Sequence, residues 1–142
     1  MNFVFHAVAF LLFFVATVRS GRTTEQTQLV TMTKAELLEI VDCISKSQNQ
    51  ATCDRFAVCN NKMPEQVLKA YERCDAEINS NRHRRCNKKE QLFSSVEIPS
   101  KIFDCVNTST KKLNAGESKK MIEFETCART LYIGSCPSPK RV

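Results

Sequence analysis

The stretch that decides the fold is Met63–Cys86, with the sequence MPEQVLKAYERCDAEINSNRHRRC. Apolar residues recur in it at positions i, i+4, i+7 and i+11, which predicts an amphipathic helix with one buried face. These residues are Val67, Tyr71, Cys74 and Ile78. Pro64 suits the first turn of a helix, where an N–H group is not needed. A basic loop follows and ends at Cys86, with three cysteines before the stretch and three after it. We therefore expect this helix at the centre of a disulfide-linked bundle.

Residues 1–20 predict a secretory signal peptide. Val4 to Val18 is almost entirely apolar, and the run is shorter than the roughly 20 residues that a membrane-spanning helix needs. Val18 and Ser20 occupy the small-residue positions that signal peptidase recognises, so cleavage is predicted after Ser20. The protein is accordingly expected to be secreted and extracellular.

The chain has 142 residues, eight cysteines and a formal net charge of +6, which suits one small basic domain. An even number of cysteines in a secreted chain predicts four disulfides, whose pairing the sequence leaves open. The cysteines are Cys43, Cys53, Cys59, Cys74, Cys86, Cys105, Cys127 and Cys136. A zinc site is not expected, because there is no C-x2-C pair and His83 is the one histidine that follows the signal peptide. No other cofactor is expected.

The rest of the chain predicts an all-α bundle of five to six helices. Residues 21–32 are expected to be a flexible arm or a short propeptide, 33–136 the helical domain and 137–142 a tail. Thr33 and Glu36 have the spacing of a capping box for the first helix, and a polar turn separates it from a short helix over about 52–60. In that short helix Cys53 and Cys59 lie about 120° apart around the axis, so they should bond to two different neighbours.

Three further helices are expected beyond Cys86. A second capping box at residues 87–90 predicts a helix through Leu92 and Phe93, and Pro99 predicts the start of another. The last helix is expected over about 117–133, with Gly134 ending it.

The basic loop is the candidate target-binding site. Its cations are Arg82, Arg84, Arg85, Lys88 and Lys89. Such a cluster can bind anionic surfaces such as heparan chains, lipid headgroups or acidic channel vestibules. The alternative is a solvated loop whose charge maintains solubility. Nucleic acid is not expected as a partner, because no aromatic side chains stand among the cations to stack on bases.

Two modification patterns accompany the loop. Arg82–Arg85 fits the R-x-[K/R]-R processing pattern, although Cys86 directly after it would hinder a protease. Asn107-Thr108-Ser109 is an N-glycosylation sequon, so Asn107 is a candidate glycosylation site.

Catalytic motifs are missing from the sequence. One histidine after the signal peptide gives no pair for ribonuclease-type acid–base chemistry, and neither G-x-S-x-G nor H-E-x-x-H occurs. Lysozyme-type chemistry is not expected either, because the chain lacks tryptophan and the cysteine spacing of that family. We therefore expect a protein that is not an enzyme.

Taken as a whole, the chain resembles the secreted helical cysteine-rich proteins of arachnid venoms and saliva. The cysteines are separated by 9, 5, 14, 11, 18, 21 and 8 residues, in a basic chain with a signal peptide. The final C-x8-C of Cys127 and Cys136 is also similar to that of arthropod odorant-binding proteins, whose C-x3-C has no counterpart here. The first resemblance implies secretion into venom or haemolymph. With the basic loop and the lack of catalytic motifs, it leads us to expect a monomeric toxin-like effector that binds a channel, a receptor or an anionic surface. The second implies an extracellular carrier of a small apolar ligand.

Overall fold

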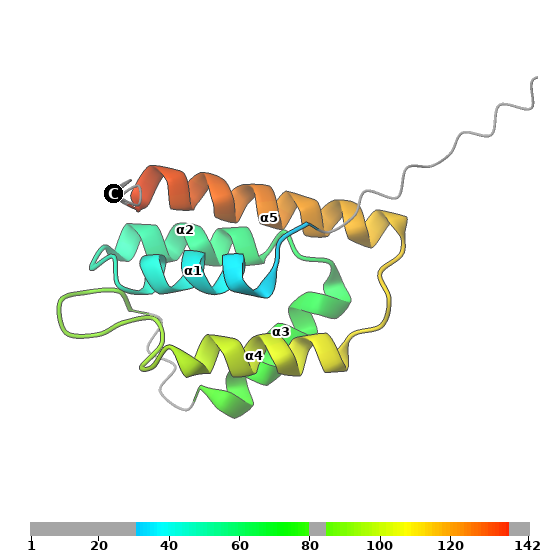
Figure 1. Ribbon diagram of the computed structural model, residues 1–142, viewed down its shortest axis with the longest axis horizontal. Helices are drawn as coiled ribbons and strands as arrows, with labels where there is room; N and C mark the ends of the chain where they lie inside the picture. Colours follow the sequence, from blue (N-terminus) through cyan, green and yellow to red (C-terminus); the bar gives the residue numbers. More distant parts are fainter. Residues whose placement is uncertain (1–30, 80–84, 137–142) are drawn as a thin grey trace, which may run out of the picture.

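The computed structural model describes residues 31–79 and 85–136 and contains five α-helices in that part of the chain (Figure 1). They are α1 (Lys34–Ser45), α2 (Gln50–Asn60), α3 (Glu65–Ile78), α4 (Glu97–Ser109) and α5 (Ala115–Ser135). No strand occurs within these two ranges. The predicted all-α, disulfide-linked bundle is confirmed. None of the described helices combines the length and apolar character needed to cross a membrane.

Helix α1 joins the two parts of the bundle. Figure 1 shows α1, α2 and α5 side by side, with α3 crossing α4 beneath them, and α1 packs against α2, α4 and α5. Ile40, Val41 and Ile44 of α1 are almost completely buried. They meet Phe124 and Ala128 of α5 in the same core cluster. The apolar face of the central helix is also buried or half-buried, as the sequence predicted.

Four disulfides join the helices: Cys43–Cys136, Cys53–Cys86, Cys59–Cys127 and Cys74–Cys105. As expected from their angular separation, Cys53 and Cys59 of α2 bond to two different partners. Every bond joins one of the first four cysteines to one of the last four. The bonds thereby link α1 and α2 to the end and middle of α5, and α3 to α4.

Only one of the two hydrogen bonds of the predicted capping box forms at the start of α1. The Thr33 hydroxyl accepts a hydrogen bond from the Glu36 amide at 3.1 Å, as predicted. The Glu36 carboxylate does not return this bond but accepts from Arg129 of α5, at 2.5 Å from Nε and 3.0 Å from Nη2. The expected capping box is therefore half formed, because a bidentate guanidinium contact binds the carboxylate more strongly than one amide would.

A buried carboxylate on α5 binds the segment that precedes α1. Glu125 is completely buried and accepts hydrogen bonds from the Thr31 amide, the Thr31 hydroxyl and the Met32 amide, all at 3.1–3.2 Å. Arg129 adds an ion pair at 3.4 Å. We call Glu125, Arg129 and Glu36 the N-terminal clamp. Thr31 and Met32, expected at the end of the arm, are thus bound to the bundle.

The prediction of a helix directly after Cys86 is wrong. Residues 85–95 form bends, and the Asn87 side chain accepts from the amides of Lys89 and Glu90 at 2.8 and 3.0 Å, closing a tight turn instead of capping a helix. The Phe93 amide donates to the buried Ser45 hydroxyl of α1 at 3.2 Å. The tertiary contact uses the amide that a helix would need.

The predicted bounds of the last helix are also wrong. Gly134 does not stop α5, which continues through Ser135 with Cys136 as its C-cap. The start lies earlier too, at Ala115, because Asn114 and Glu117 form a complete capping box. The disulfide of Cys136 fixes the end of this helix, so glycine is not required there.

Candidate functional site

The predicted basic loop is described in part. Arg82 and Arg84 lie outside the described residues, while Arg85, Lys88 and Lys89 are all exposed. Cys86 between them is completely buried, is bonded to Cys53 of α2, and donates its amide to Gln50 Oε1 at 3.1 Å. The exposed cations therefore project from a backbone that is covalently attached to α2.

The tight turn at Asn87 sets the direction of the two lysines. Besides the two bonds that the Asn87 side chain accepts, its own amide donates to the Glu90 carbonyl at 2.9 Å. We call residues 85–90 the basic turn. Glu90 partly neutralises it, since its carboxylate lies 3.8 Å from Arg85. Lys88 and Lys89 form no ion pair with a described residue, so they are its available cations.

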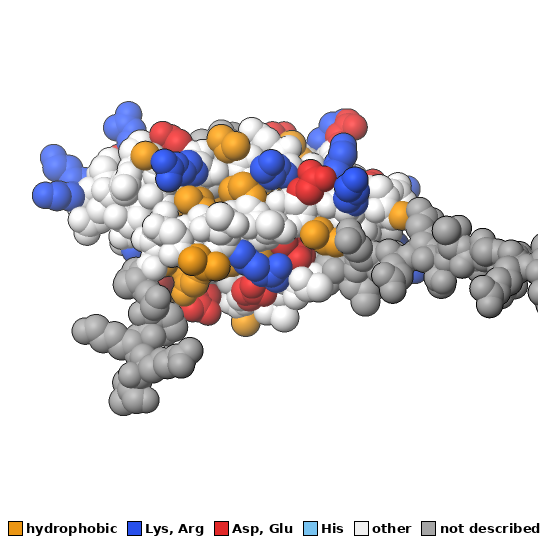
Figure 2. Space-filling view, turned by 90° about the horizontal axis from the view of Figure 1, so that it is seen from above, with side chains coloured by type: hydrophobic (Ala, Val, Ile, Leu, Met, Phe, Trp, Pro, Cys, Tyr) orange, Lys and Arg blue, Asp and Glu red, His pale blue; other side chains and the backbone are white. Residues whose placement is uncertain are grey.

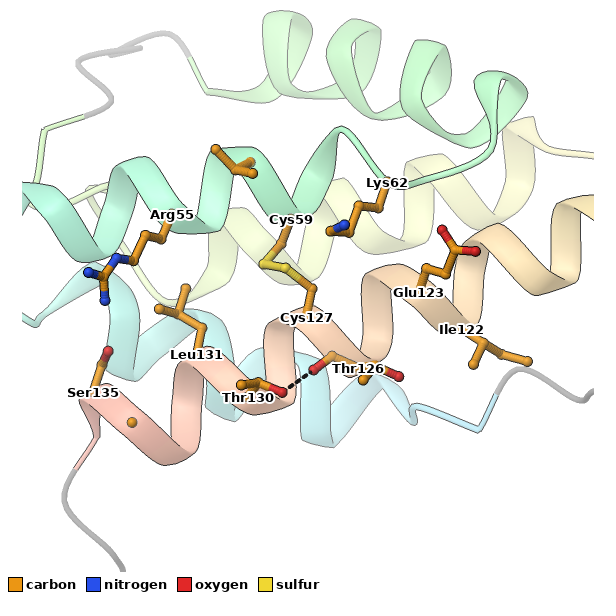
Figure 3. Close-up of a pocket in the computed structure, with 12 residues that line it drawn as sticks. Arg55, Cys59, Lys62, Ile122, Glu123, Thr126, Cys127, Thr130, Leu131 and Ser135 are labelled. Atoms are coloured by element: carbon orange, nitrogen blue, oxygen red, sulfur yellow. Dashed lines mark hydrogen bonds between the residues drawn. A yellow bond between two sulfur atoms is a disulfide. The ribbon is translucent and has the colours of Figure 1, made fainter.

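A second cationic feature is an open groove of about 730 Å³ between α2 and α5 (Figure 3). The Cys59–Cys127 disulfide crosses the middle of this α2–α5 groove, and Leu131 adds an apolar wall. Val58, which also lines the groove, is 60% exposed. An exposed apolar side chain in a groove indicates a surface suited to contact with another molecule.

Charged side chains stand along both edges of the α2–α5 groove. Arg55 of α2 and Lys62, in the turn after α2, reach over it, and Glu123 stands on α5 (Figure 3). Neither Arg55 nor Lys62 forms an ion pair with another described residue. Figure 2, which looks onto the α5 side, shows hydrophobic patches interspersed with Lys and Arg side chains on this face. The groove therefore combines apolar contact area with unpaired positive charge.

Arg55 and Lys62 were not predicted as site residues, although their spacing is a signal. Lys62 follows Arg55 by seven residues, close to two helical turns, and lies in the turn directly after α2. Val58 lies between them on the same side. The two cations were not recognised as a pair because the position of α5 beside that face depends on the Cys59–Cys127 bond, and the sequence does not specify the pairing.

A second concavity, of about 570 Å³, lies among α1, α3, α4 and α5, and we call it the apolar hollow. Seven apolar side chains line it: Met32, Leu37, Val67, Phe103, Val106, Leu113 and Met121. Lys111 and Lys112 also line it and are exposed. An apolar hollow with cations at its mouth is the arrangement that a small amphipathic anion would fit.

The sequon asparagine lies on the wall of the apolar hollow. Asn107 is exposed and sits in the last turn of α4, not in the loop that follows. Thr108, the next residue, directs its hydroxyl to the carbonyls of Asp104 and Cys105 at 3.0 Å. Glycosylation of Asn107 stays a prediction.

Side chains that could bind a metal ion do not cluster in the part of the chain that the structure describes. No three His, Cys, Asp or Glu side chains there lie close enough together to hold a metal ion. Both histidines, His6 and His83, fall outside the described ranges.

Comparison with known protein families finds a match over most of the described chain. The model of the Hi1a-like family, described as U10-hexatoxin-Hi1a, matches residues 31–137. The chain belongs to this family. The Hi1a-like family is a spider venom toxin family, so the resemblance to cysteine-rich arachnid venom proteins is confirmed. No curated protein and no solved structure matches the chain significantly.

Membership of the Hi1a-like family fits the chemistry of the bundle. A venom toxin family and four disulfides are consistent with a secreted protein. The matched region begins at Thr31, the residue that the N-terminal clamp binds. The likeness to odorant-binding proteins stays a prediction, and the predicted signal peptide lies outside the described residues.

Proposed function

We propose that this Hi1a-like protein is a secreted, monomeric, non-enzymatic venom toxin that binds an acidic surface of a channel or receptor through the basic turn. The observation that carries the proposal is the attachment of Lys88 and Lys89 to a turn closed by Asn87 and fixed by the Cys53–Cys86 bond. Charged side chains on a fixed backbone lose less conformational entropy on binding than those on a free loop. Family membership supports the toxin part of the proposal.

The α2–α5 groove extends the proposed contact surface. Arg55 and Lys62 add two cations without described partners, and Val58 adds exposed apolar area. Positive potential speeds the encounter with an acidic target, whereas apolar area slows dissociation. We assign recognition of the target's charge to the basic turn and part of the affinity to the groove.

Charge reversal tests the basic turn. Labelled protein is bound to excitable-tissue membranes, and the variant Arg85→Glu/Lys88→Glu/Lys89→Glu is compared with wild type. Its affinity should fall by at least about tenfold and should become less sensitive to salt. The matched control is Lys101→Glu/Lys119→Glu/Lys120→Glu, which makes the same charge change at exposed positions elsewhere. Equal affinity of the two variants would remove the basic turn as the binding site.

The nature of the target is tested on the same membranes. Protease treatment of the membranes should abolish binding, because the proposed target is a protein. Binding that survives protease and is reproduced by anionic vesicles would replace the protein target with a lipid surface. Competition by heparin alone would replace it with a heparan chain.

The apolar hollow supports a second candidate function, an extracellular carrier of a small apolar ligand. Its volume of about 570 Å³ is within the range of about 300–1,000 Å³ typical of small-molecule sites. A fluorescent fatty-acid probe should bind saturably, and Met121→Trp should block it by filling the hollow. Ile133→Trp, at a position that is 79% exposed, is the matched control. Probe binding that Met121→Trp leaves unchanged would exclude this function.

A further inference from the structure

A third concavity, of about 310 Å³, lies on the other side of α2 from the α2–α5 groove, and we call it the acidic hollow. Helices α2 and α3 and the segment at Leu92 and Phe93 enclose it. Three carboxylates line it: Asp54, Glu72 and Asp75. No described lysine or arginine lines it. Its charge is therefore opposite to that of the groove.

Asp75 is the most unusual of these carboxylates because it is only 5% exposed. Among the described residues, one group donates to the carboxylate, the Asn79 side-chain nitrogen at 3.1 Å. A buried carboxylate is normally paired with a cation or accepts several hydrogen bonds. Asp75 has neither among the described residues, so no described cation neutralises it.

Two buried acceptors in the same hollow also lack donors. Asn60 and Asn79 are 8% and 4% exposed, and the side-chain oxygen of each finds no hydrogen-bond partner within the described chain. The orientation of the Asn79 amide is fixed, because turning it over would place its oxygen against the Asp75 carboxylate. Native proteins rarely leave buried acceptors unpaired, and a bound donor is one explanation of such an exception.

The missing donor should carry positive charge and several N–H groups. A metal ion does not fit, because no three acidic side chains converge closely enough in the described ranges. An organic cation can reach oxygens that are several ångströms apart, and its methylene stem can pack on the walls that Phe56 and Phe93 provide. Aromatic rings also attract such cations through their faces.

We propose that the acidic hollow binds an alkylguanidinium or alkylammonium group. The cation satisfies Asp75 and the two asparagine oxygens together. It is either the end of a basic side chain on a partner protein or a small free polyamine. The hollow does not include the basic turn, so this site is independent of the proposed function.

A pair of ligands of equal shape tests the charge requirement. Butylguanidinium and the neutral butylurea are titrated separately into isotopically labelled protein, and the side-chain amide signals of Asn60 and Asn79 are followed by NMR. Butylguanidinium should shift both signals saturably, and butylurea should shift neither at the same concentrations. A hollow that holds water alone would give no saturable shift with either ligand, which would overturn the proposal.

Asp75→Asn tests the anchoring carboxylate with a change of charge and almost none of shape. It should weaken butylguanidinium binding by at least about tenfold, the effect of losing one charge-assisted hydrogen bond. Glu77→Gln makes the same charge change at an exposed α3 position outside the hollow and should stay within about twofold of wild type. Equal affinities of the two variants would refute the assignment.

A thermal-melting experiment covers the case in which Asp75→Asn fails to fold. Asn60→Leu replaces one unpaired acceptor by an apolar side chain of similar size, so it should raise or preserve the melting temperature without ligand. It should also reduce the further rise that butylguanidinium gives. A loss of stability with the ligand effect intact would contradict the proposal. A peptide with one arginine and free spermidine distinguish the two sources of the cation, by which of them binds more tightly.

Discussion

The N-terminal clamp and the acidic hollow each contain a buried carboxylate, and their surroundings differ. Glu125 in the clamp accepts three hydrogen bonds from Thr31 and Met32 and pairs with Arg129. Asp75 in the hollow accepts one bond, from a neutral amide of its own helix region. Both residues are almost completely buried.

This difference separates a structural charge from a charge available for binding. The clamp needs nothing from outside, because its donors come from the chain itself. The hollow has three carboxylates and two buried oxygens that no described donor satisfies. Substitutions on the clamp should therefore change stability, and those in the hollow should change binding.

The largest expected effect comes from removing the disulfide beside the acidic hollow. Cys53→Ala/Cys86→Ala removes the bond that fixes the segment carrying Phe93, and it should lower the free energy of unfolding by about 4 kcal/mol because it releases a closed loop. Butylguanidinium binding should be lost as well. Cys43→Ala/Cys136→Ala, which opens a longer loop and removes no residue that lines the hollow, is the control and should lose stability but keep binding. Equal losses of binding in the two variants would contradict the role of the Cys53–Cys86 bond in holding the Phe93 side of the acidic hollow.

The next largest effect is expected from a substitution that breaks the N-terminal clamp. Arg129→Met removes the cation shared by Glu36 and Glu125 and leaves the buried Glu125 without its ion pair. We expect a loss of about 3 kcal/mol in urea denaturation, typical of breaking a buried ion pair. Arg73→Met, at an exposed position on α3, should stay within about 0.5 kcal/mol of wild type. A small effect at Arg129 would show that the clamp does not need the guanidinium.

Two isosteric changes compare the carboxylates directly. Glu125→Gln should cost about 2 kcal/mol, since it replaces a carboxylate that accepts charge-assisted bonds by an amide that donates as well. Asp75→Asn should cost less than about 0.5 kcal/mol without ligand, because the carboxylate is poorly satisfied. Urea denaturation of both variants measures the contrast. The reverse order would remove the distinction between the two regions.

The smallest effect concerns pH and the exposed part of the clamp. The Arg129 side chain, which donates to the Glu36 carboxylate, lowers the pKa of Glu36 below its ordinary value of 4.5. This contribution to stability is therefore complete above that value and is lost as the pH falls through the lowered pKa. Both side chains are about one-third exposed, so it should be below about 1 kcal/mol. Glu36→Gln should have a flatter acid limb of melting temperature against pH than wild type, and equal slopes would contradict this.

Much of the fold follows from the sequence because helical spacing and caps are local. The apolar stripe of α3 and the Thr33 cap were predicted from a few neighbouring residues, and both are present. The helix expected after Cys86 failed because Ser45, far away in the chain, binds the Phe93 amide. A long-range contact of this kind leaves no periodic signal.

The sites were predictable only in part. The cations of the basic turn are visible in the sequence because they are adjacent, whereas Arg55 and Lys62 become a pair only when α5 lies beside α2. The acidic hollow gives no local signal, because Asn60 and Asp75 meet only after α2 and α3 fold together. Burial, which makes these oxygens informative, is a property of the packed bundle.

The order of the disulfides has a consequence for proteolysis. All four bonds cross from the first four cysteines to the last four, so any cut between Cys74 and Cys86 is spanned by every one of them. Cleavage at the R-x-[K/R]-R pattern of residues 82–85 would therefore give a two-chain molecule whose halves stay together until they are reduced. A nick after Arg85 would separate this residue from the rest of the basic turn and leave the covalent framework of the bundle complete.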